Sequence, residues 1–588
     1  MTIQNIKIQN VRGIDELLIP DKIRKNKPNI LVAPNGFGKT SIATAFKSAI
    51  KQTSIKLNKI DRHEHDETKL ASLSIDLEED SSSITLNATE VARSNEIRKE
   101  FDILVVSDLR KIKSYTRKMG GFSRAEAKLT IPPIEICNIV RTNENPYKIS
   151  QLKRDFGDHK ELLPNLNTDL FDSYDLVSRS QELLIYIDTL GKPRSLKKSS
   201  SIQQKITRFP CTHIDALSNA EPEIEQFAAE FPAAKAALYL ITRNTKLDKP
   251  KAFLAIWQLL QTAKTARKDL HGYLEWKRYK SLKQSIVENL RCLNTSWKNV
   301  QVNETKGKLV ITIPEPADIS NGQRDVLLLL SMMHIARNSL AKARAIILID
   351  EVFDYLDDAN LIVAQYFLSQ LINEYKRQGR ALYLIILTHL NPAFFKNYVF
   401  SNQNTIYLDQ GIDYNVALAM KKLLAARSQD SVSDDIKDKI SKYLVHYHTD
   451  DYDFSSDLSS INGIRPTWGK QGRFQSFIQD EFKKYQDGEL YDPLAICAIT
   501  RRKIEEHAYK QIEHLAESNT FFTTHKTAPK LDWSAKRGAD IPESHHLLRI
   551  VFDDGLHFGE NKNNIVPIVS KLSNPIIKKM IVEAVNRA

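Results

Sequence analysis

The chain has 588 residues, of which 42% are hydrophobic and 27% charged. At roughly 100–200 residues per domain this length predicts about three or four domains, and the apolar content excludes wholesale disorder. No apolar run approaches the ~18–20 residues that span a bilayer, and no signal-peptide core follows Met1, so we expect a cytoplasmic protein without a membrane contact. The formal charge of +12 permits contact with nucleic acid without establishing it.

Four cysteines, Cys137, Cys211, Cys292 and Cys497, lie too far apart in sequence for a Cys-x-x-Cys clip. A disulfide scaffold and a structural zinc site are therefore not expected. This agrees with a reducing compartment.

Short apolar runs in the first hundred residues predict strands around one helix. They are Leu17–Ile19, Ile30–Val32, Leu73–Leu77, Ile84–Leu86 and Ile103–Val106. Helical patterns follow between about 150 and 300, with the polar stretch Ser199–Ser201 expected to be a loop or linker.

Alternation of helix and strand returns after residue 300. The expected elements are a strand at Leu309–Ile313, a helix at Gln323–Ala336, and strands at Ala345–Ile349 and Ala381–Leu387. Ser428–Asp435 is a polar boundary before a mostly helical tail. We therefore expect four segments with bounds 1–145, 146–300, 301–427 and 428–588.

A glycine-rich loop follows the strand Ile30–Val32 and opens a helix at Ser41. It has the Walker A pattern with Ala33 in the place of the first glycine, and its backbone N–H groups and the helix N-terminus suit phosphates. Lys39 would reach the β and γ phosphates, and the Thr40 hydroxyl would bind Mg²⁺. An ordinary glycine turn is the alternative. The expected ATP-binding residues are Asn35, Gly36, Phe37, Gly38, Lys39, Thr40 and Ser41.

A second element matches the first. The apolar strand Ala345–Ile349 ends in Asp350 and Glu351, which is the Walker B arrangement. Asp350 would hold Mg²⁺, and Glu351 would orient and deprotonate the attacking water. A solvated strand end is the alternative, and the presence of Walker A argues against it.

Ile319–Gln323 opens an apolar helix 28 residues before Asp350. It resembles the Leu-Ser-Gly-Gly-Gln signature of ABC-type ATPases, which binds the γ-phosphate held by the other protomer. The resemblance assigns ATP contacts to Ser320, Asn321, Gly322 and Gln323. A simple helix cap at Ser320 is the alternative.

Two further segments complete the resemblance to an ABC-type ATPase head. Phe353–Asp357 resembles the D-loop, and the strand ending at Thr388 delivers His389, like the switch histidine of that class. The resemblance implies an α/β P-loop fold with a helical insertion and a helical C-terminal domain, ATP and Mg²⁺ as ligands, Lys39, Glu351 and His389 in catalysis, and a homodimer with composite ATP sites. No glutamine stands after Ile103–Val106, where a Q-loop is expected, and Ser107 or Asp108 could take its place.

The opening Ile6–Ile14 resembles SMC, RecF and related nucleic-acid ATPases, although the segment between Thr40 and Ser320 is too short for a long SMC arm. Within that segment His271–Lys283 interleaves basic and aromatic residues. It could grip a phosphate backbone, or it could be an amphipathic helix with a solvated basic face.

The tail has a candidate nuclease site. Arg502 and Glu506 are four residues apart on a predicted helix, and His507 follows. An arginine and a histidine on paired helices are the catalytic parts of HEPN-type ribonucleases, and the tail also resembles the anticodon nucleases PrrC and RloC. In that match Arg502 and Glu506 are the arginine and the glutamate of an Arg-Glu-His nuclease site, and its histidine is one of His545, His546 and His557. A surface salt bridge between Arg502 and Glu506 is the alternative.

Stand-alone heads with short insertions resemble bacterial anti-phage ATPases. The leading hypothesis is a defence ATPase whose nucleotide state controls cleavage of nucleic acid, tRNA or DNA, by its own tail or by a partner nuclease as in Septu-type systems. A RecF-like or SMC-like DNA clamp without nuclease activity and a non-catalytic scaffold are the alternatives.

Overall fold

The computed structural model describes residues 2–587 except at the following positions: 35, 51–52, 80–81, 92–93, 108–110, 120–121, 131, 158–169, 172, 174–175, 178, 211, 293–299, 315–320, 391–399, 409–413 and 557–564. The chain forms two compact units. One comprises Met1–Asp108 and Lys342–Ala588, and the other is Leu109–Ala341. The predicted segment bounds at 145, 300 and 427 remain predictions.

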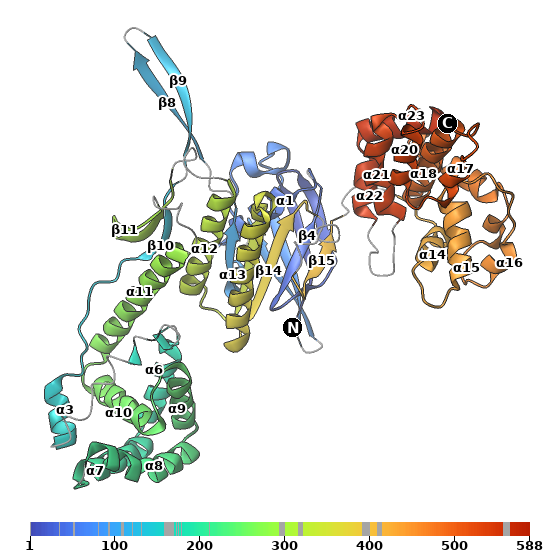
Figure 1. The fold of residues 1–588 in the computed structure, drawn as a ribbon. Coiled ribbons are helices and arrows are strands. Elements are labelled where there is room, and N and C mark those ends of the chain that lie inside the picture. The colour runs from blue at the N-terminus through green and yellow to red at the C-terminus, as the bar shows by residue number, and fades with distance from the viewer. Residues whose placement is uncertain are drawn as a thin grey trace. The chain divides into compact units, whose positions relative to one another are not determined.

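The first unit contains a parallel sheet with the strand order β15-β4-β14-β13-β7; β14, β4 and β15 are labelled in Figure 1. The strands are β4 (Lys27–Val32), β7 (Phe101–Val106), β13 (Arg344–Asp350), β14 (Ala381–Thr388) and β15 (Asn404–Tyr407). All four pairings are parallel, and every residue of β14 is buried. Near-continuous apolar strands are typical of a sheet covered on both faces. The α/β class predicted from the sequence is therefore confirmed.

An antiparallel sheet packs with the helix that follows β4. Its strands are β1 (Thr2–Val11), β2 (Ile14–Ile19), β3 (Ile23–Arg24), β5 (Ser72–Glu79) and β6 (Ser82–Thr89). Helix α1 (Lys39–Ser48) contacts both β1 and the parallel strands β7 and β13. Ile42 and Phe46 of α1 belong to one buried cluster with residues of both sheets.

Short helices and one long helix complete this part of the unit. They are α2 (Glu96–Glu100), α13 (Asp358–Arg377) and the 3₁₀ turns η1 (Lys59–Asp61), η2 (His63–His65) and η4 (Val352–Tyr355). Helix α13 begins where the Asp357 carboxylate accepts the Asn360 N–H at 2.8 Å, a standard N-cap.

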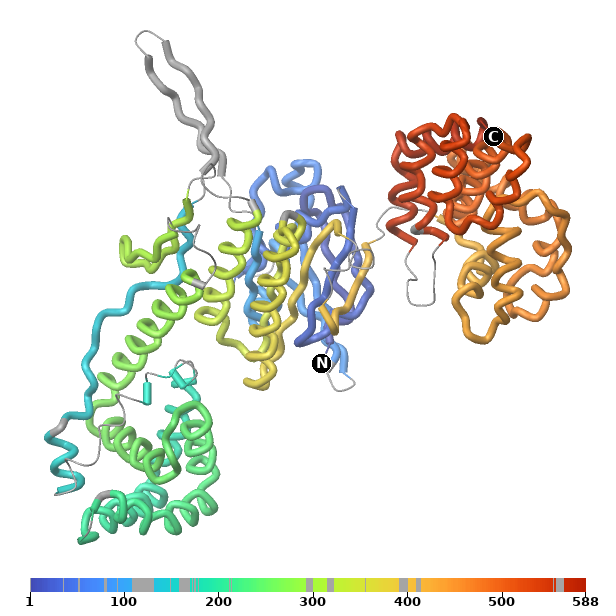
Figure 2. The backbone as a smooth tube through the Cα atoms, in the orientation of Figure 1, coloured from blue at the N-terminus to red at the C-terminus, as the bar shows by residue number. Residues whose placement is uncertain are grey.

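The second unit contains mostly helices (green in Figure 2) and two small sheets. The helices are α3 (Ile149–Phe156), α6 (Ser180–Leu190), α7 (Pro193–Arg208), α8 (His213–Glu230), α9 (Pro232–Asn244), α10 (Lys249–Thr265), α11 (Arg267–Cys292) and α12 (Asn321–Ser339). The strands are β8 (Lys111–Met119), β9 (Phe122–Thr130), β10 (Ile134–Asn138), β11 (Gln301–Thr305) and β12 (Lys308–Thr312).

The loop expected at Ser199–Ser201 is wrong, because these serines lie inside helix α7. The Ser199 and Ser200 hydroxyls both donate to the Leu196 carbonyl oxygen, at 3.0 and 2.8 Å. Serine favours loops because its hydroxyl competes for backbone groups, but here that hydroxyl bonds back within the helix. Ser199, Ile202 and Ile206 are buried, so tertiary packing overrides the local preference.

Residues from Tyr414 onward share a single large buried cluster (orange to red in Figure 2). The helices are α14 (Leu418–Ala426), α15 (Asp434–Lys439), α16 (Ser455–Ser459), α17 (Arg473–Asp487), α18 (Pro493–Lys510), α19 (Thr520–Thr523), α20 (Thr527–Ala535), α21 (Glu543–Leu556), α22 (Val566–Leu572) and α23 (Pro575–Arg587), with a π-helical turn η5 (Ile440–Val445) and a 3₁₀ turn η6 (Pro466–Gly469). Helix α18 is the central one and contacts α17, α20, α21 and α23.

Among the helices that the structure describes, none combines the length and the apolar character needed to cross a membrane.

Candidate nucleotide site

The loop between β4 and α1 requires glycine at two positions. Gly36 has φ +90° and Gly38 has φ +83°, in the left-handed region that side chains disfavour. A Cβ at Gly36 would meet nothing within 4 Å, so the loop surface is open there. Gly38 precedes the first turn of α1, whose N–H groups suit an anion. Asn35, predicted to contact ATP, lies outside the described residues.

Lys39 lies in the first turn of α1 and is almost completely buried. Its Nζ donates to the carbonyl oxygens of Ala33 at 2.9 Å and Pro34 at 3.2 Å. The same Nζ is 3.5 Å from the Glu351 carboxylate. The structure therefore brings together the Walker A lysine and the predicted general base.

Three strand ends meet at one edge of the parallel sheet, because parallel strands present their carboxyl ends on the same side. The Ala33 N–H after β4 donates to the Thr388 carbonyl at 3.0 Å, and the Glu351 N–H after β13 donates to the Leu387 carbonyl at 3.1 Å. Strand β14 thus fixes the glycine-rich loop on one side and the two carboxylates on the other.

Asp350 ends β13 as a buried carboxylate. Its Oδ1 has no hydrogen-bond partner among the residues that the structure describes. Burial and the neighbouring Glu351 charge raise the pKa of Asp350 to about 6, against the opposing charges of Lys47 and Lys39. A buried carboxylate oxygen without a donor suits a hard cation, and Mg²⁺ commonly takes one or two carboxylates in phosphate sites. Asp350 therefore fits the predicted metal role, and Thr40, the other predicted metal ligand, is exposed in the first turn of α1.

The burial of Asp350 predicts that this residue lowers the stability of the fold at high pH. Since its folded pKa is raised, the stability that it contributes is present at low pH and is lost as pH rises through about 6. Without metal or nucleotide, Asp350→Asn should raise the melting temperature, and more at pH 8 than at pH 5. Stabilisation of the wild type by Mg²⁺ with nucleotide should grow over the same pH range, and the part that depends on Mg²⁺ should be smaller in the variant. Thermal unfolding at both pH values measures this, and an equal shift at pH 5 and pH 8 would contradict it.

Glu351 is held in a strained backbone conformation. Its φ of +55° is left-handed, which costs a non-glycine residue about 1–3 kcal/mol and occurs preferentially at functional sites. Its side chain is 36% exposed, whereas that of Lys39 is 3% exposed. Glu351 can therefore contact water while its charge faces the buried lysine, as a general base requires.

His389 is positioned by an acid from the predicted D-loop. The Asp354 carboxylate in η4 is 2.7 Å from His389 Nδ1 and also accepts a hydrogen bond from the Thr388 hydroxyl. Asp354 is 1% exposed and His389 is 38% exposed. The acid therefore orients the ring, and the partly exposed side chain can be reached from solvent, as the predicted role of a switch histidine requires.

Lys47 is a residue of this region that the sequence analysis missed. It lies two turns after Lys39 on α1 and donates to the hydroxyl of Ser107. Burial lowers the pKa of Lys47, and the Asp350 charge opposes that change. Ser107 follows β7, where the Q-loop glutamine was expected, and Asp108 lies outside the described residues. The spacing from Lys39 was visible in the sequence, but its proximity to Ser107 depends on packing.

The signature segment is described only from Asn321 onward, since Ser320 lies outside the described residues. Asn321 begins helix α12, with Gly322 and Gln323 in its first turn and partly buried. The assignment of ATP contacts to this segment remains a prediction.

Several basic residues of the segment His271–Lys283 contact aromatic or acidic residues on helix α11 or next to it. Lys277 is buried with its Nζ 5.8 Å from the Tyr273 ring, and Lys280 lies over Trp276. Lys283 and the Tyr279 hydroxyl both bond Glu304, each at 2.6 Å. Tyr273 and Tyr279 are buried and Trp276 packs partly buried against the core, so the interpretation as an amphipathic helix is favoured.

The candidate nuclease residues of the tail lie on α18 but have different surroundings. Arg502 is buried, and its Nη1 donates to the carbonyls of Tyr443 at 2.5 Å and His446 at 2.6 Å, at the end of η5. Glu506 forms ion pairs with Lys503 at 2.8 Å and Lys510 at 3.0 Å. Arg502 therefore stabilises the end of the π-helical turn η5. Among the described contacts, no ion pair joins Arg502 to Glu506.

The histidines of the tail form one close contact. The rings of His507 and His545 are 5.1 Å apart in an edge-to-face arrangement. Burial lowers the pKa of His545 to about 4. His546 is partly buried beside them, and His557 lies outside the described residues. In the described part of the chain, no group of three or more histidine, cysteine or acidic residues could hold a metal ion. The nuclease assignment remains a prediction.

No protein-family model matches the sequence, and no curated protein matches it. The chain is similar to solved head domains of SMC proteins. The head of Pyrococcus furiosus Smc, bound to the C-terminal domain of ScpA, is 11% identical and covers 68% of this chain and 92% of its own, with a TM-score of 0.26. The Thermotoga maritima head is 11% identical over 66% and 90%, with a TM-score of 0.21. The Pyrococcus yayanosii head is 14% identical over 66% and 92%, with a TM-score of 0.23. Such low scores assign no family, so function must come from the site.

Proposed function

We propose that the chain binds and hydrolyses ATP with Mg²⁺ at the carboxyl edge of the parallel sheet. The observation that carries the proposal is the convergence of a buried lysine, a strained glutamate 3.5 Å away and a buried aspartate oxygen without a partner. A chance glycine turn would not place all three at neighbouring strand ends.

Each residue has a distinct role in this proposal. Lys39 neutralises charge that develops on the transferred phosphoryl group, and the N–H groups around Gly36 and Gly38 bind the phosphates. Asp350 and Thr40 would hold Mg²⁺, which supplies charge neutralisation between phosphates. Glu351 accepts a proton from the attacking water, and Asp354 keeps His389 oriented for contact with the reacting phosphate.

We further propose that the active form is a homodimer in which the signature segment of one chain completes the site of its partner. The turnover rate per chain should then rise with protein concentration. Lys39→Ala and Ser320→Arg chains should each be inactive and should recover about a quarter of wild-type activity when mixed in equal amounts, because half of the dimers are mixed and each has one intact site.

The matched control mixes Lys39→Ala with Glu351→Gln. Since Lys39 and Glu351 belong to the same chain's site, no mixed dimer regains an intact site and no recovery is expected. Recovery in this control, or a turnover per chain that is independent of concentration, would contradict the composite dimer.

The biological role that we propose for this ATPase rests on the sequence resemblance. It is an anti-phage ATPase whose nucleotide state controls cleavage of nucleic acid, by the tail or by a partner nuclease. A DNA clamp without nuclease activity is the alternative. RNA sequencing after expression of the wild type and of His507→Ala tests the version with a tail ribonuclease, since only that version predicts cleaved RNA that disappears in the variant. His507 is preferred over Arg502 because loss of Arg502 would also free the carbonyls of η5.

A further inference from the structure

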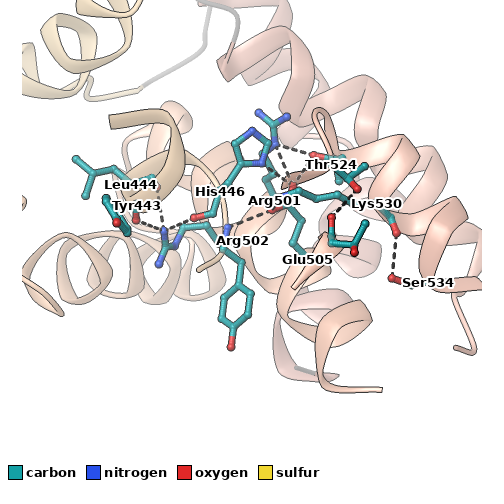
Figure 3. A network of polar contacts seen from close by, with 12 residues as sticks. Tyr443, Leu444, His446, Arg501, Arg502, Glu505, Thr524, Lys530 and Ser534 are labelled. Atoms are coloured by element: carbon teal, nitrogen blue, oxygen red, sulfur yellow. Dashed lines mark hydrogen bonds and ion pairs between the residues drawn. The ribbon is translucent and has the colours of Figure 1, made fainter. Parts of the chain in front are cut away.

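A buried polar centre lies at the middle of α18, one residue away from the positions that the sequence favoured (Figure 3). Glu505 is completely buried and accepts hydrogen bonds from the His446 ring at 2.8 Å, the Thr527 hydroxyl at 2.7 Å and Lys530 Nζ at 3.1 Å. The Tyr447 N–H adds a fourth bond at 3.1 Å. The charge of Glu505 is therefore satisfied mainly by groups other than Arg501.

The guanidinium group of Arg501 has a donor that makes no hydrogen bond to the groups around Glu505. Its Nε donates to the Thr527 hydroxyl at 2.7 Å and lies 3.6 Å from Glu505. Its Nη1 is buried and has no hydrogen-bond partner among the described residues. An unmet donor on a buried cation is costly, because the charged group has lost its water.

A second arginine with an unmet donor lies on the neighbouring helix α21. Arg549 Nε is buried without a hydrogen-bond partner in the described part of the chain. Asp553 stands between the two arginines, 3.9 Å from Arg501 Nη2 and 3.9 Å from Arg549 Nε. Both distances exceed hydrogen-bond length, so one carboxylate serves two guanidinium groups and bonds neither.

A third arginine increases the positive charge. Burial and the positive charge of Arg501 lower the pKa of Arg427 to about 10, so these two like charges lie close together. Arg427 bonds only neutral groups among its described contacts, the Ser441 hydroxyl at 3.1 Å and the Leu556 carbonyl at 2.7 Å. Two arginines, Arg501 and Arg549, therefore share one loosely placed carboxylate, Asp553. The side chains of Arg549 and Asp553 are 36% and 33% exposed, which gives access from solvent.

We propose that Arg501 and Arg549 form an anion site that takes a single phosphate group. The unmet N–H donors of two guanidinium groups match phosphate oxygens, which arginine binds as a planar fork. Arg501 forms the floor of the site and Arg549 its exposed rim. Asp553 holds the arginines in place when the phosphate is absent and competes with it. The site is independent of the ATP site proposed above.

Opposite effects of two neighbouring substitutions test the site. All chains carry Lys39→Ala, so that binding at the glycine-rich loop is weakened equally. Isothermal titration calorimetry with inorganic phosphate and with AMP should show binding that Arg549→Gln weakens by about tenfold or more, since it removes a charge-assisted hydrogen bond. Asp553→Asn should instead tighten binding, because it removes the competing carboxylate. Arg537→Gln, which removes a surface arginine paired with Glu517, is the control and should change nothing.

The arms of the titration also identify the source of the phosphate. Binding of AMP with little binding of a single-stranded RNA oligonucleotide indicates a free nucleotide, and tighter binding of the oligonucleotide indicates a nucleic-acid strand. Either result supports the site when Arg549→Gln weakens that binding by about tenfold or more. An absence of binding, or equal affinities in Arg549→Gln and Asp553→Asn, would show that the cluster is only a loose internal ion pair. Arg549 and Asp553 are partly exposed, so both variants are expected to fold.

Discussion

Glu351→Gln is expected to reduce ATP turnover by about 10²–10⁴-fold while ATP binding persists. The amide cannot accept the proton of the attacking water, whereas Lys39 and Asp350 still hold the phosphates and the metal. Loss of the negative charge 3.5 Å from Lys39 Nζ also removes a competitor for that lysine, so ATP should bind at least as tightly as in the wild type. Phosphate release and nucleotide binding, measured on the same preparation, check both parts.

A surface glutamate gives the matched control. Glu16 lies 2.7 Å from Lys7 and its side chain is 55% exposed, so Glu16→Gln removes one surface carboxylate to which no role is assigned. Its turnover should equal that of the wild type. If Glu351→Gln turns over ATP within about threefold of the wild type, well short of the range for a general base, the assignment of Glu351 is wrong.

A large loss of folding stability is expected when Glu505, the buried acid of helix α18, is removed. Glu505→Ala should destabilise the chain by about 3–5 kcal/mol, the usual cost of removing one partner from a buried ionic network. Lys530 and Arg501 would be left as buried cations, and the Tyr447 N–H and the Thr527 hydroxyl would each lose an acceptor. Chemical unfolding, followed by circular dichroism, measures the difference.

Glu506→Ala is the control for this prediction, since it alters the next residue of the same helix. Its partners Lys503 and Lys510 are partly exposed, and the change should cost at most about 1 kcal/mol. Equal losses for Glu505→Ala and Glu506→Ala would contradict the burial of Glu505.

The same centre predicts the sign of the acid response. Burial alone would raise the pKa of Glu505, but the charges of His446, Lys530 and Arg501 and the hydrogen bond from the His446 ring hold it well below its usual range. The stability that Glu505 contributes is therefore present above the pKa of an unfolded glutamate, about 4.3, and is lost as pH falls through the folded value. The difference between wild type and Glu505→Ala should shrink in acid.

The candidate nucleotide site could be predicted from the sequence because each of its motifs is local. The strand Ile30–Val32, two glycines and Lys39 are contiguous, and Asp350 and Glu351 directly end an apolar strand. What the sequence could not show is the pairing of distant segments. Lys47 reaches Ser107 across 60 residues, and Asp354 reaches His389 across 35.

The tail shows why a helical pattern alone cannot select a site. Arg501 with Glu505 and Arg502 with Glu506 have the same i, i+4 spacing, so the sequence offers both pairs equally. Only the packing of His446 and Lys530 against the helix shows that Glu505 faces the interior and Glu506 the solvent-exposed lysines. A shift of one residue on a helix turns the side chain by about 100°, which is enough to exchange a buried centre for a surface pair.

The most direct measurement is ATP binding and Mg²⁺-dependent ATP hydrolysis, compared side by side in the wild type, Lys39→Ala and Glu351→Gln. The account predicts that the wild type binds and hydrolyses, that Glu351→Gln binds without hydrolysing, and that Lys39→Ala does neither at the same nucleotide concentration. Hydrolysis that persists in both variants, or a wild type that binds no ATP, would contradict the proposal that the edge of the parallel sheet is an ATPase site.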